Sequence, residues 1–326
     1  MSNIVNVQYE MDRFSGKRAD LKVIKTNKEF KFNFDLNKKN HQTIYGLLQE
    51  GHLYEADVSN FMVRTINEGD IAVDVGANVG FYSMLLCSLN NDKGQVIAFE
   101  PSDLNASEIK ENQLTNNYTN IDIRQKLVGD SNAKEVFYHF SALDSGTSYA
   151  RETLPQDQLD YEKKNVFTLD DELKEFNAIK LVKIDVEGFE VKVLKGAHNL
   201  LSKNQVRYWI VEYIPSTYEQ NGESLDSLKT YMSQFDYELF ILDYQRGFPK
   251  HYPVSLDFSG RYVMNLLFAK MDDLANDWVF EDTTKLCAPP RAWWFGLVKP
   301  YEIAPRPQHQ VLPHHCHRLR QELAGQ

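Results

Sequence analysis

The chain has 326 residues, of which 42% are hydrophobic and 25% are charged, an ordinary composition for a globular protein. Its formal net charge of −10 argues against a general nucleic-acid binder, since such proteins neutralise phosphates with Lys and Arg. No run of about 18 apolar residues occurs, so no membrane span is predicted. The three cysteines form no CxxC pair and the N-terminus lacks an apolar signal segment, so we expect a cytoplasmic protein.

The first part of the chain is predicted to precede the main fold. Residues 1–40 are polar, with one alternating stretch at 29–36 that is typical of a strand. Residues 41–66 have helical spacing in two pieces, broken near Gly51. We therefore expect a polar lead-in at 1–40 and the start of a domain at 41.

From Asp70 onward, short apolar strands alternate with helices. The predicted strands are 71–75, 95–99, 121–128, 180–184, 208–213, 237–242 and 262–270, and the predicted helices are 79–89, 103–117, 190–202 and 224–235. This alternation predicts an α/β fold around a mostly parallel sheet. The last two strands have no helix between them, which predicts an antiparallel strand at the edge.

The alternation is interrupted in the middle of the chain. Residues 134–140 alternate like a strand, 142–164 form a polar, turn-rich insertion, and 165–176 run from a strand into a short helix. The domain is expected to end near residue 270. Residues 271–326 are predicted to be an appendage whose later part is rich in Pro, His and Arg.

The stretch AVDVGANVGFYS (72–83) places glycines where a predicted strand becomes a helix. Gly76 has no Cβ, so the chain can turn sharply and approach a ligand. Asn78 tolerates left-handed backbone angles, and Gly80 is expected to let the helix pack closely on the strand. The free N–H groups of the helix N-terminus would face an anionic ligand group.

The spacing of this motif indicates which ligand it holds. It lacks the middle glycine that a dinucleotide pyrophosphate needs, which disfavours a nicotinamide-dependent oxidoreductase. Glu100 ends the next predicted strand, where its carboxylate could hold ribose hydroxyls. Asp74 could attract an ammonium. A nucleoside with a zwitterionic amino-acid tail fits these residues, and S-adenosylmethionine (SAM) is such a molecule.

Four blocks occur in a fixed order: AVDVGANVGFYS, AFEPS (98–102), FTLDDEL (167–173) and KIDVEGFEVKVLKGA (183–197). Together they closely resemble the FkbM-type SAM-dependent methyltransferases, over about residues 50–245. The resemblance implies a Rossmann-like class I methyltransferase fold, with a seven-stranded, mostly parallel sheet, an antiparallel last strand and helices on both faces. It also implies methyl transfer, usually to a hydroxyl of a sugar, polyketide or other natural product.

The resemblance further implies which residues meet the cofactor. The glycine-rich block would line its methionine part and Glu100 would hold its ribose. Gln125, at the end of the third strand, is expected beside the adenine, and Glu55 near the amine end. The full expected set is Glu55, Asp74, Gly76, Ala77, Asn78, Gly80, Phe81, Glu100, Pro101, Ser102 and Gln125.

KIDVEGFEVKVLKGA crowds acids at the end of a strand. Asp185 follows the strand predicted beside the glycine-rich turn, so we expect it to face the transferring methyl group. Glu187 either converges with Asp185 on one acceptor or one divalent cation such as Mg²⁺, or accepts backbone N–H groups at Gly188. Glu190 is expected to stabilise the next helix. Glu212, at the end of the following strand, completes the predicted catalytic set. Two carboxylates are a thin ligand set, so no metal ligand is assigned.

The function expected from these residues is SAM-dependent O-methylation of a hydroxyl on a sugar, glycan or natural-product small molecule. N-methylation of a small molecule is an alternative, because an amine already carries a lone pair and needs no strong base. A catalytically inactive cofactor-binding scaffold is another. The sequence does not identify the acceptor.

Overall fold

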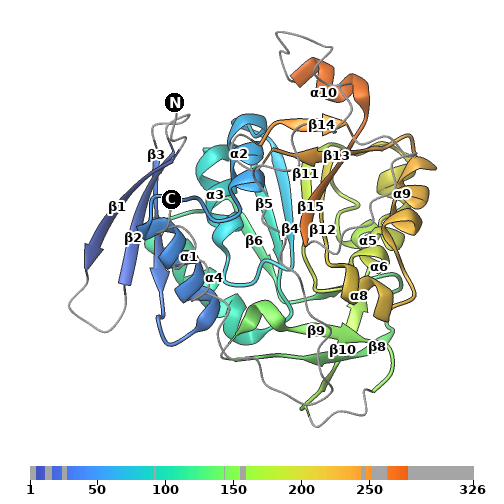
Figure 1. Cartoon of the computed structure of the whole chain (residues 1–326), viewed down its shortest axis with the longest axis horizontal. Coiled ribbons are helices and arrows are strands. Elements are labelled where there is room, and N and C mark those ends of the chain that lie inside the picture. Colours follow the sequence, from blue (N-terminus) through green and yellow to red (C-terminus); the bar gives the residue numbers. More distant parts are fainter. Residues whose placement is uncertain are drawn as a thin grey trace, which may run out of the picture.

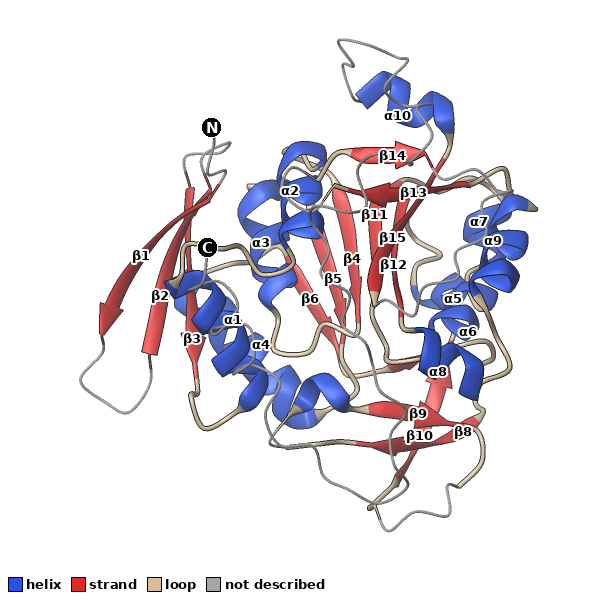
Figure 2. Ribbon diagram, viewed as in Figure 1, coloured by secondary structure: helices blue, strands red, loops and turns tan. Residues whose placement is uncertain are grey.

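In the computed structural model, the chain is built around one eight-stranded sheet with helices on both faces (Figure 1, Figure 2). The structure describes residues 5–11, 17–23, 28–91, 93–142, 144–154, 159–243, 247–251 and 263–277. The strands lie in the order β14 (Pro249–His251), β13 (Glu238–Leu242), β15 (Met264–Ala269), β12 (Val206–Tyr213), β11 (Ile179–Ile184), β4 (Ile71–Val75), β5 (Gln95–Phe99) and β6 (Ile121–Arg124). The predicted Rossmann-like α/β architecture is confirmed.

Strand direction departs from the prediction at one edge. The strands β6, β5, β4, β11 and β12 run parallel, and β15 is antiparallel to both β12 and β13. The antiparallel pairing of the last two predicted strands is confirmed, but its expected place at the edge is wrong, because β15 lies inside the sheet. The edge is an unpredicted eighth strand, β14, which begins at Pro249. Proline lacks a backbone N–H donor and is tolerated on edge strands.

The helices lie on the two sides of this sheet (Figure 2). On one side are α1 (Lys39–Gln49), α2 (Ala56–Thr65), α3 (Phe81–Asn90) and α4 (Asp103–Asn116), and on the other are α5 (Leu169–Glu172), α6 (Glu190–Lys195), α7 (His198–Ser202), α8 (Pro215–Gln220) and α9 (Leu225–Ser233). Each side buries its own core, and β4 contributes Ala72 to one core and Val73 and Val75 to the other. This alternation follows from the two-residue period of a strand.

The predicted helix 190–202 is two short helices, α6 and α7, because the chain turns at Gly196. A Cβ on Gly196 would lie 1.9 Å from the carbonyl oxygen of Gly129, so only glycine fits this contact. The chain ends, as far as it is described, with α10 (Met271–Asp277). Among the described helices, none is both long enough and apolar enough to cross a membrane. The remainder of the predicted appendage lies outside the described residues.

The N-terminal residues form more than the one predicted strand. β1 (Val5–Met11), β2 (Lys17–Val23) and β3 (Lys28–Phe34) make a three-stranded antiparallel sheet beside the main one (Figure 1). The strand predicted at 29–36 is confirmed by β3, whose Phe30, Phe32 and Phe34 are buried in the core that also holds α3. Phe32 packs edge-on against Phe81 with ring centroids 5.7 Å apart.

The insertion and its flanking segments form a second sheet, in which the strand predicted at 134–140 is confirmed and the strands within 142–164 were not predicted. A second, four-stranded sheet has the order β7 (Leu127–Val128), β10 (Glu162–Phe167), β8 (Glu135–His139) and β9 (Tyr149–Arg151). The predicted strand 121–128 is therefore divided, since β6 stays in the main sheet while β7 pairs with β10. A short 3₁₀ turn, η1 (Ser145–Thr147), precedes β9. This small sheet lies beyond the lower ends of the central strands in Figure 2.

Candidate active site

The turn between β4 and α3 forms one wall of a cleft at the carboxyl end of the central strands. Gly76 has φ +78°, and a Cβ on it would lie 1.8 Å from the carbonyl oxygen of Asp185. The N–H groups of Gly76 and Ala77 donate to the carbonyl of Phe99 at 2.9 and 3.0 Å. Asn78 has φ +51°, the left-handed conformation predicted for it. The turn is thus fixed between the ends of β5 and β11.

Glu100 follows β5 and is held by three donors. Its Oε2 accepts the N–H of Asn78 at 2.8 Å, and its Oε1 accepts the N–H of Ser102 at 3.0 Å and Nδ2 of Asn105 at 3.3 Å. Burial raises the pKa of Glu100 to about 7, although these hydrogen bonds act in the opposite direction. Glu100 lines the cleft. Its contact with the ribose stays a prediction that this placement supports.

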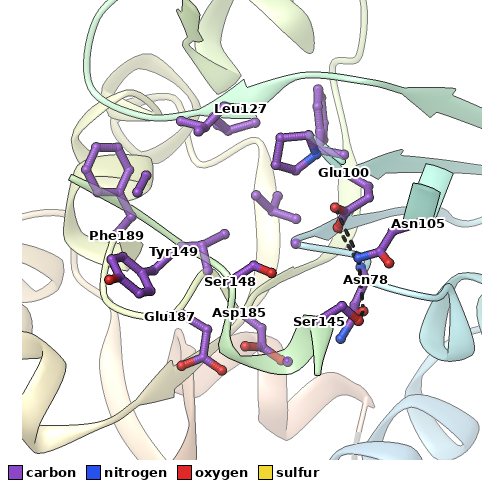
Figure 3. Close-up of a pocket in the computed structure, with 18 of the residues that line it drawn as sticks. Asn78, Glu100, Asn105, Leu127, Ser145, Ser148, Tyr149, Asp185, Glu187 and Phe189 are labelled. Atoms are coloured by element: carbon purple, nitrogen blue, oxygen red, sulfur yellow. Dashed lines mark hydrogen bonds between the residues drawn. The ribbon is translucent and has the colours of Figure 1, made fainter. Parts of the chain in front are cut away.

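The cleft encloses about 830 Å³ of empty space, measured out to its open mouth. In Figure 3, Glu100 and Asn78 lie toward one end, while Asp185 and Glu187 lie toward the other. All three predicted catalytic residues line the cleft, namely Asp185, Glu187 and Glu212. The predicted cofactor residues that line it are Glu55, Gly76, Asn78, Glu100 and Pro101.

The other six residues predicted at the cofactor do not line the cleft: Asp74, Ala77, Gly80, Phe81, Ser102 and Gln125. Asp74 is buried, and its Oδ2 accepts the hydroxyl of Ser83 at 2.7 Å. Gly80 has φ +87°, and a Cβ there would lie 2.9 Å from the side chain of Ile109. The close contact expected between helix and strand is therefore a contact between α3 and α4.

The remaining cofactor predictions fall on residues with visible structural roles. Phe81 belongs to the aromatic core, and Ser102 caps the N-terminus of α4. Gln125 is exposed, with Nε2 3.4 Å from a carboxylate oxygen of Asp103. Residues that are neighbours in a motif alternate between the cleft and the core, and the motif alone does not show which of them face the cleft. The three residues that directly follow Gln125 in the sequence do line the cleft, namely Lys126, Leu127 and Val128.

The sequence reasoning missed Lys183. Its side chain lies on β11, only 2% exposed, with Nζ 2.7 Å from Oδ2 of Asp185. The ammonium also lies 4.7 Å from the centre of the Tyr82 ring, a cation–π distance. A signal was available, because Lys183 interrupts an apolar strand two residues before Asp185, on the same face.

Three carboxylates converge beside this lysine. One oxygen from each of Glu55, Asp185 and Glu212 lies within 4.8 Å of the other two. Glu55 accepts the hydroxyl of Tyr82 at 2.7 Å, and Glu212 is hydrogen bonded to Asp185. We predicted that Asp185 would pair with Glu187. The sequence does not show that β12 and the segment before α2 bring Glu212 and Glu55 close to Asp185.

The environment separates the protonation of these acids. Burial alone would raise the pKa of Asp185, but the Lys183 ammonium outweighs it and holds that pKa below its ordinary value. Burial, together with the charge of Asp185, raises the pKa of Glu212 well above the usual range. The same two causes raise the pKa of Glu187. Asp185 is therefore the acid of this pair that loses its proton first, and Glu212 is the one that keeps its proton to higher pH.

The turn after Asp185 corrects the roles expected for the neighbouring glutamates. The buried carboxylate of Glu190 accepts the N–H groups of Val186 and Gly188 at 3.1 and 3.0 Å. The bonds expected for Glu187 are thus made by Glu190, in addition to its position in the first turn of α6. Glu187 has φ +53° and lines the cleft instead. The prediction that Glu187 accepts backbone N–H groups at Gly188 is therefore wrong, and its role at an acceptor stays a prediction.

The Glu190→Gln variant should weaken the pH dependence of stability. Burial raises the pKa of Glu190 from 4.5 to about 7 in the folded protein. Between these values the unfolded state loses its proton first, so the free energy of unfolding falls as pH rises through this window and then levels off. The expected loss is of order 3 kcal/mol from this residue. Glutamine keeps the accepting oxygen and has no such titration.

Urea unfolding at pH 5, 6, 7 and 8 measures this effect. Glu190→Gln should lose less stability than the wild type from pH 5 to 8, while Glu111→Gln, at an exposed position of α4, should follow the wild type. Parallel curves for wild type and Glu190→Gln would contradict the interpretation.

The insertion contributes one wall of the cleft that sequence reasoning left unassigned. Oγ of Ser145 donates to Oδ1 of Asn78 at 2.5 Å, and Nδ2 of Asn40 donates to Oγ of Ser145 at 2.6 Å. Asp144 accepts from Lys39 at 2.7 Å. These bonds join α1, the glycine-rich turn and the insertion. The lining residues from this segment are Ser145, Gly146, Ser148, Tyr149 and Ala150.

The doubly covered sheet, its glycine-rich turn after β4 and the acidic residue after β5 define the class I methyltransferase fold. The family model of the methyltransferase FkbM domain matches residues 74–239. The chain belongs to this FkbM family of SAM-dependent methyltransferases.

Individual relatives are more distant. The hexuronic acid methyltransferase AglP of Haloferax volcanii is 30% identical over 162 residues, which are 48% of this chain and 62% of that protein. The chain thus spans less than two thirds of this curated relative. The solved FkbM methyltransferase of Methylobacillus flagellatus is 20% identical, with a TM-score of 0.41 over 62% of this chain and 44% of its own. SMU.1697c of Streptococcus mutans, a putative methyltransferase solved with S-adenosylhomocysteine (SAH), is 10% identical, with a TM-score of 0.39 over 67% and 98% of the two chains.

Proposed function

We propose that this protein transfers a methyl group from SAM to a hydroxyl of a sugar, glycan or similar polyhydroxylated small molecule. The observation that carries the proposal is that Asp185 and Glu187 both line the part of the cleft opposite Glu100. Tyr149 and Phe189 lie in the same region (Figure 3). Carboxylates accept hydrogen bonds from hydroxyls, and aromatic rings offer apolar faces to the C–H groups of a sugar ring.

The residues at the opposite end fit SAM. Glu100 offers a carboxylate for ribose hydroxyls, and the backbone of Gly76 lines the cleft without a side chain. The apolar residues Phe99, Leu127 and Val128 offer a surface for the adenine. The acids of the cleft suit a ligand that carries both an ammonium and a sulfonium. When bound, SAM supplies an electrophilic methyl group.

The residues of the chain position the acceptor and take its proton. Asp185, charged and fixed by Lys183, accepts a hydrogen bond from the acceptor hydroxyl and orients its oxygen. Glu187 has the higher pKa of the two because of burial and the neighbouring Asp185 charge. Asp185 is therefore the acid that is deprotonated, and it receives the hydroxyl proton as the methyl group is transferred, a step that contributes about 10²–10⁴-fold in enzymes. Glu212 stays protonated and donates to Asp185.

The curated relative supports a sugar acceptor, since its name assigns it to a hexuronic acid. The acid-rich cleft favours an acceptor whose reacting part is uncharged. It is also compatible with an amine, which keeps N-methylation as the second candidate. A protein that binds SAM without turnover would be the scaffold alternative.

Mg²⁺ is not part of the proposed reaction, because Lys183 already provides the cation among Glu55, Asp185 and Glu212. A Mg²⁺ ion that acts as a Lewis acid here would place a second positive charge beside this ammonium. Methyl transfer is expected to survive EDTA. A requirement for added Mg²⁺ would contradict this.

Two measurements test the function. Isothermal calorimetry should detect binding of SAM and SAH but not of NAD, and absence of SAM binding would refute the proposal. Incubation with methyl-labelled SAM and a panel of sugars, oligosaccharides, polyols and amines should then give a labelled methyl ether. Label found only on nitrogen would instead establish the second candidate, and SAM binding without any transfer would favour the scaffold.

A further inference from the structure

Lys183 is buried more deeply than its partner and does not line the cleft. Its Nζ contacts Oδ2 of Asp185 at 2.7 Å, while Asp185 itself is 22% exposed at the cleft. Burying an ammonium is costly unless it is paired. The lysine is therefore held below the cleft floor, and Asp185 is the group that it presents to a ligand.

Charges from every neighbouring element act on this pair. Burial lowers the pKa of Lys183, but nearby carboxylates outweigh it and raise that pKa, so the ammonium stays charged. Without it, Asp185 would be an isolated charge in a buried, acidic surrounding, and would take up a proton. The titratable groups that face the pair are Tyr54 and Glu55 before α2, Asp74 of β4, Tyr82 of α3, Glu187 of the following turn and Glu212 of β12.

We propose that Lys183 is a positioning residue, whose ammonium fixes the Asp185 carboxylate in its charged form at the acceptor end of the cleft. The inference rests on the proposed function, because it assigns Asp185 to the place where the methyl group is transferred. Lys183 acts through Asp185 and contacts neither substrate.

Ligand selectivity tests this without knowledge of the acceptor. Sinefungin carries an ammonium where SAM carries its methyl-bearing sulfonium, whereas SAH has no charge there. The ratio of the SAH and sinefungin dissociation constants therefore reports the negative charge beside the transferring group. In the wild type, calorimetry should give a ratio above 10 that stays constant between pH 6 and 8.

The Lys183→Met variant should lower this ratio at least fivefold at pH 6 and recover part of it by pH 8, with little change in SAH affinity. Adding Lys183→Met to Asp185→Asn should change the ratio no further than Asp185→Asn alone. Lys180→Met is the matched control, since Lys180 lies on the same strand and pairs with Asp277 outside the cleft. It should behave as the wild type.

An unchanged, pH-independent ratio in Lys183→Met would overturn the proposal. So would an effect of equal size in the Asp185→Asn background, because Lys183 would then act independently of Asp185. If Lys183→Met does not fold, recovery of folding in Lys183→Met/Asp185→Asn supports the pairing, and failure of both contradicts it. A wild type that binds neither SAM nor SAH refutes the proposed function, whereas normal SAM binding with no response to Lys183→Met refutes only the role of Lys183.

Discussion

The Asp185→Asn variant should bind SAH within about threefold of the wild-type affinity and lose methyl transfer by about 10²–10⁴-fold. The amide keeps the size of the side chain but removes the negative charge, which holds the hydroxyl of the methyl acceptor by a hydrogen bond. Lys183 remains surrounded by Glu55 and Asp74, so its burial without Asp185 is partly compensated. The predicted loss therefore falls mainly on turnover, and the affinity for the uncharged product SAH should change little.

Calorimetry and initial rates with methyl-labelled SAM separate the two effects. Asp122→Asn is a suitable control, because Asp122 also pairs with a basic residue two positions away on a parallel strand, Arg124 at 2.8 Å. Asp122 lies outside the cleft, so its variant should keep both affinity and rate. Wild-type turnover in Asp185→Asn would show that a group other than Asp185 has the role proposed for it at the acceptor hydroxyl.

The second large effect is expected from Gly76→Ala. The alanine Cβ would lie 1.8 Å from the carbonyl oxygen of Asp185, at a positive φ of +78°. Both atoms belong to or adjoin the backbone, so no side-chain rotation relieves the clash. Separation of the turn from β11 would cost about 3 kcal/mol or more of folding stability. It would also widen the cleft between cofactor and acceptor ends.

Gly51→Ala is the matched control for backbone strain. Gly51 has nearly the same φ, +79°, but a Cβ there meets nothing within 4 Å. Its cost should be about 1–2 kcal/mol, that of the left-handed conformation alone. Urea unfolding gives both values, and calorimetry should show at least tenfold weaker SAM binding for Gly76→Ala only. Equal stability losses in the two variants would show that the contact with Asp185 is unimportant.

The two ends of the cleft differ in how far sequence could describe them. The turn after β4 is local, since Gly76 and Asn78 adopt backbone angles that their residue types favour. These two residues were therefore predictable from one motif, whereas six of the eleven residues predicted at the cofactor do not line the cleft. The other end is assembled from β9, β11, β12 and the segment before α2. Its residues are distant in sequence, and no local spacing predicts their contacts.

The acids show the same division. Sequence located Asp185, Glu187 and Glu212 at strand ends, but not their protonation. Glu190 and Glu187 stand three residues apart, yet one carboxylate is buried on backbone N–H groups and the other lines the cleft. A positive φ at Glu187 turns the chain out of strand geometry. The two-residue period that paired Glu187 with Asp185 therefore no longer applied.

The sequence by itself determined the α/β fold, the alternating faces of its strands and the glycine-rich turn, because periodicity and backbone preference are local properties. It also carried the blocks that place the chain in the FkbM family. Only the tertiary structure decided that β15 lies inside the sheet, that the insertion lines one wall of the cleft and that Lys183 pairs with Asp185. Those outcomes depend on which distant segments pack together, and packing is what sets the burial and the charge of each acid.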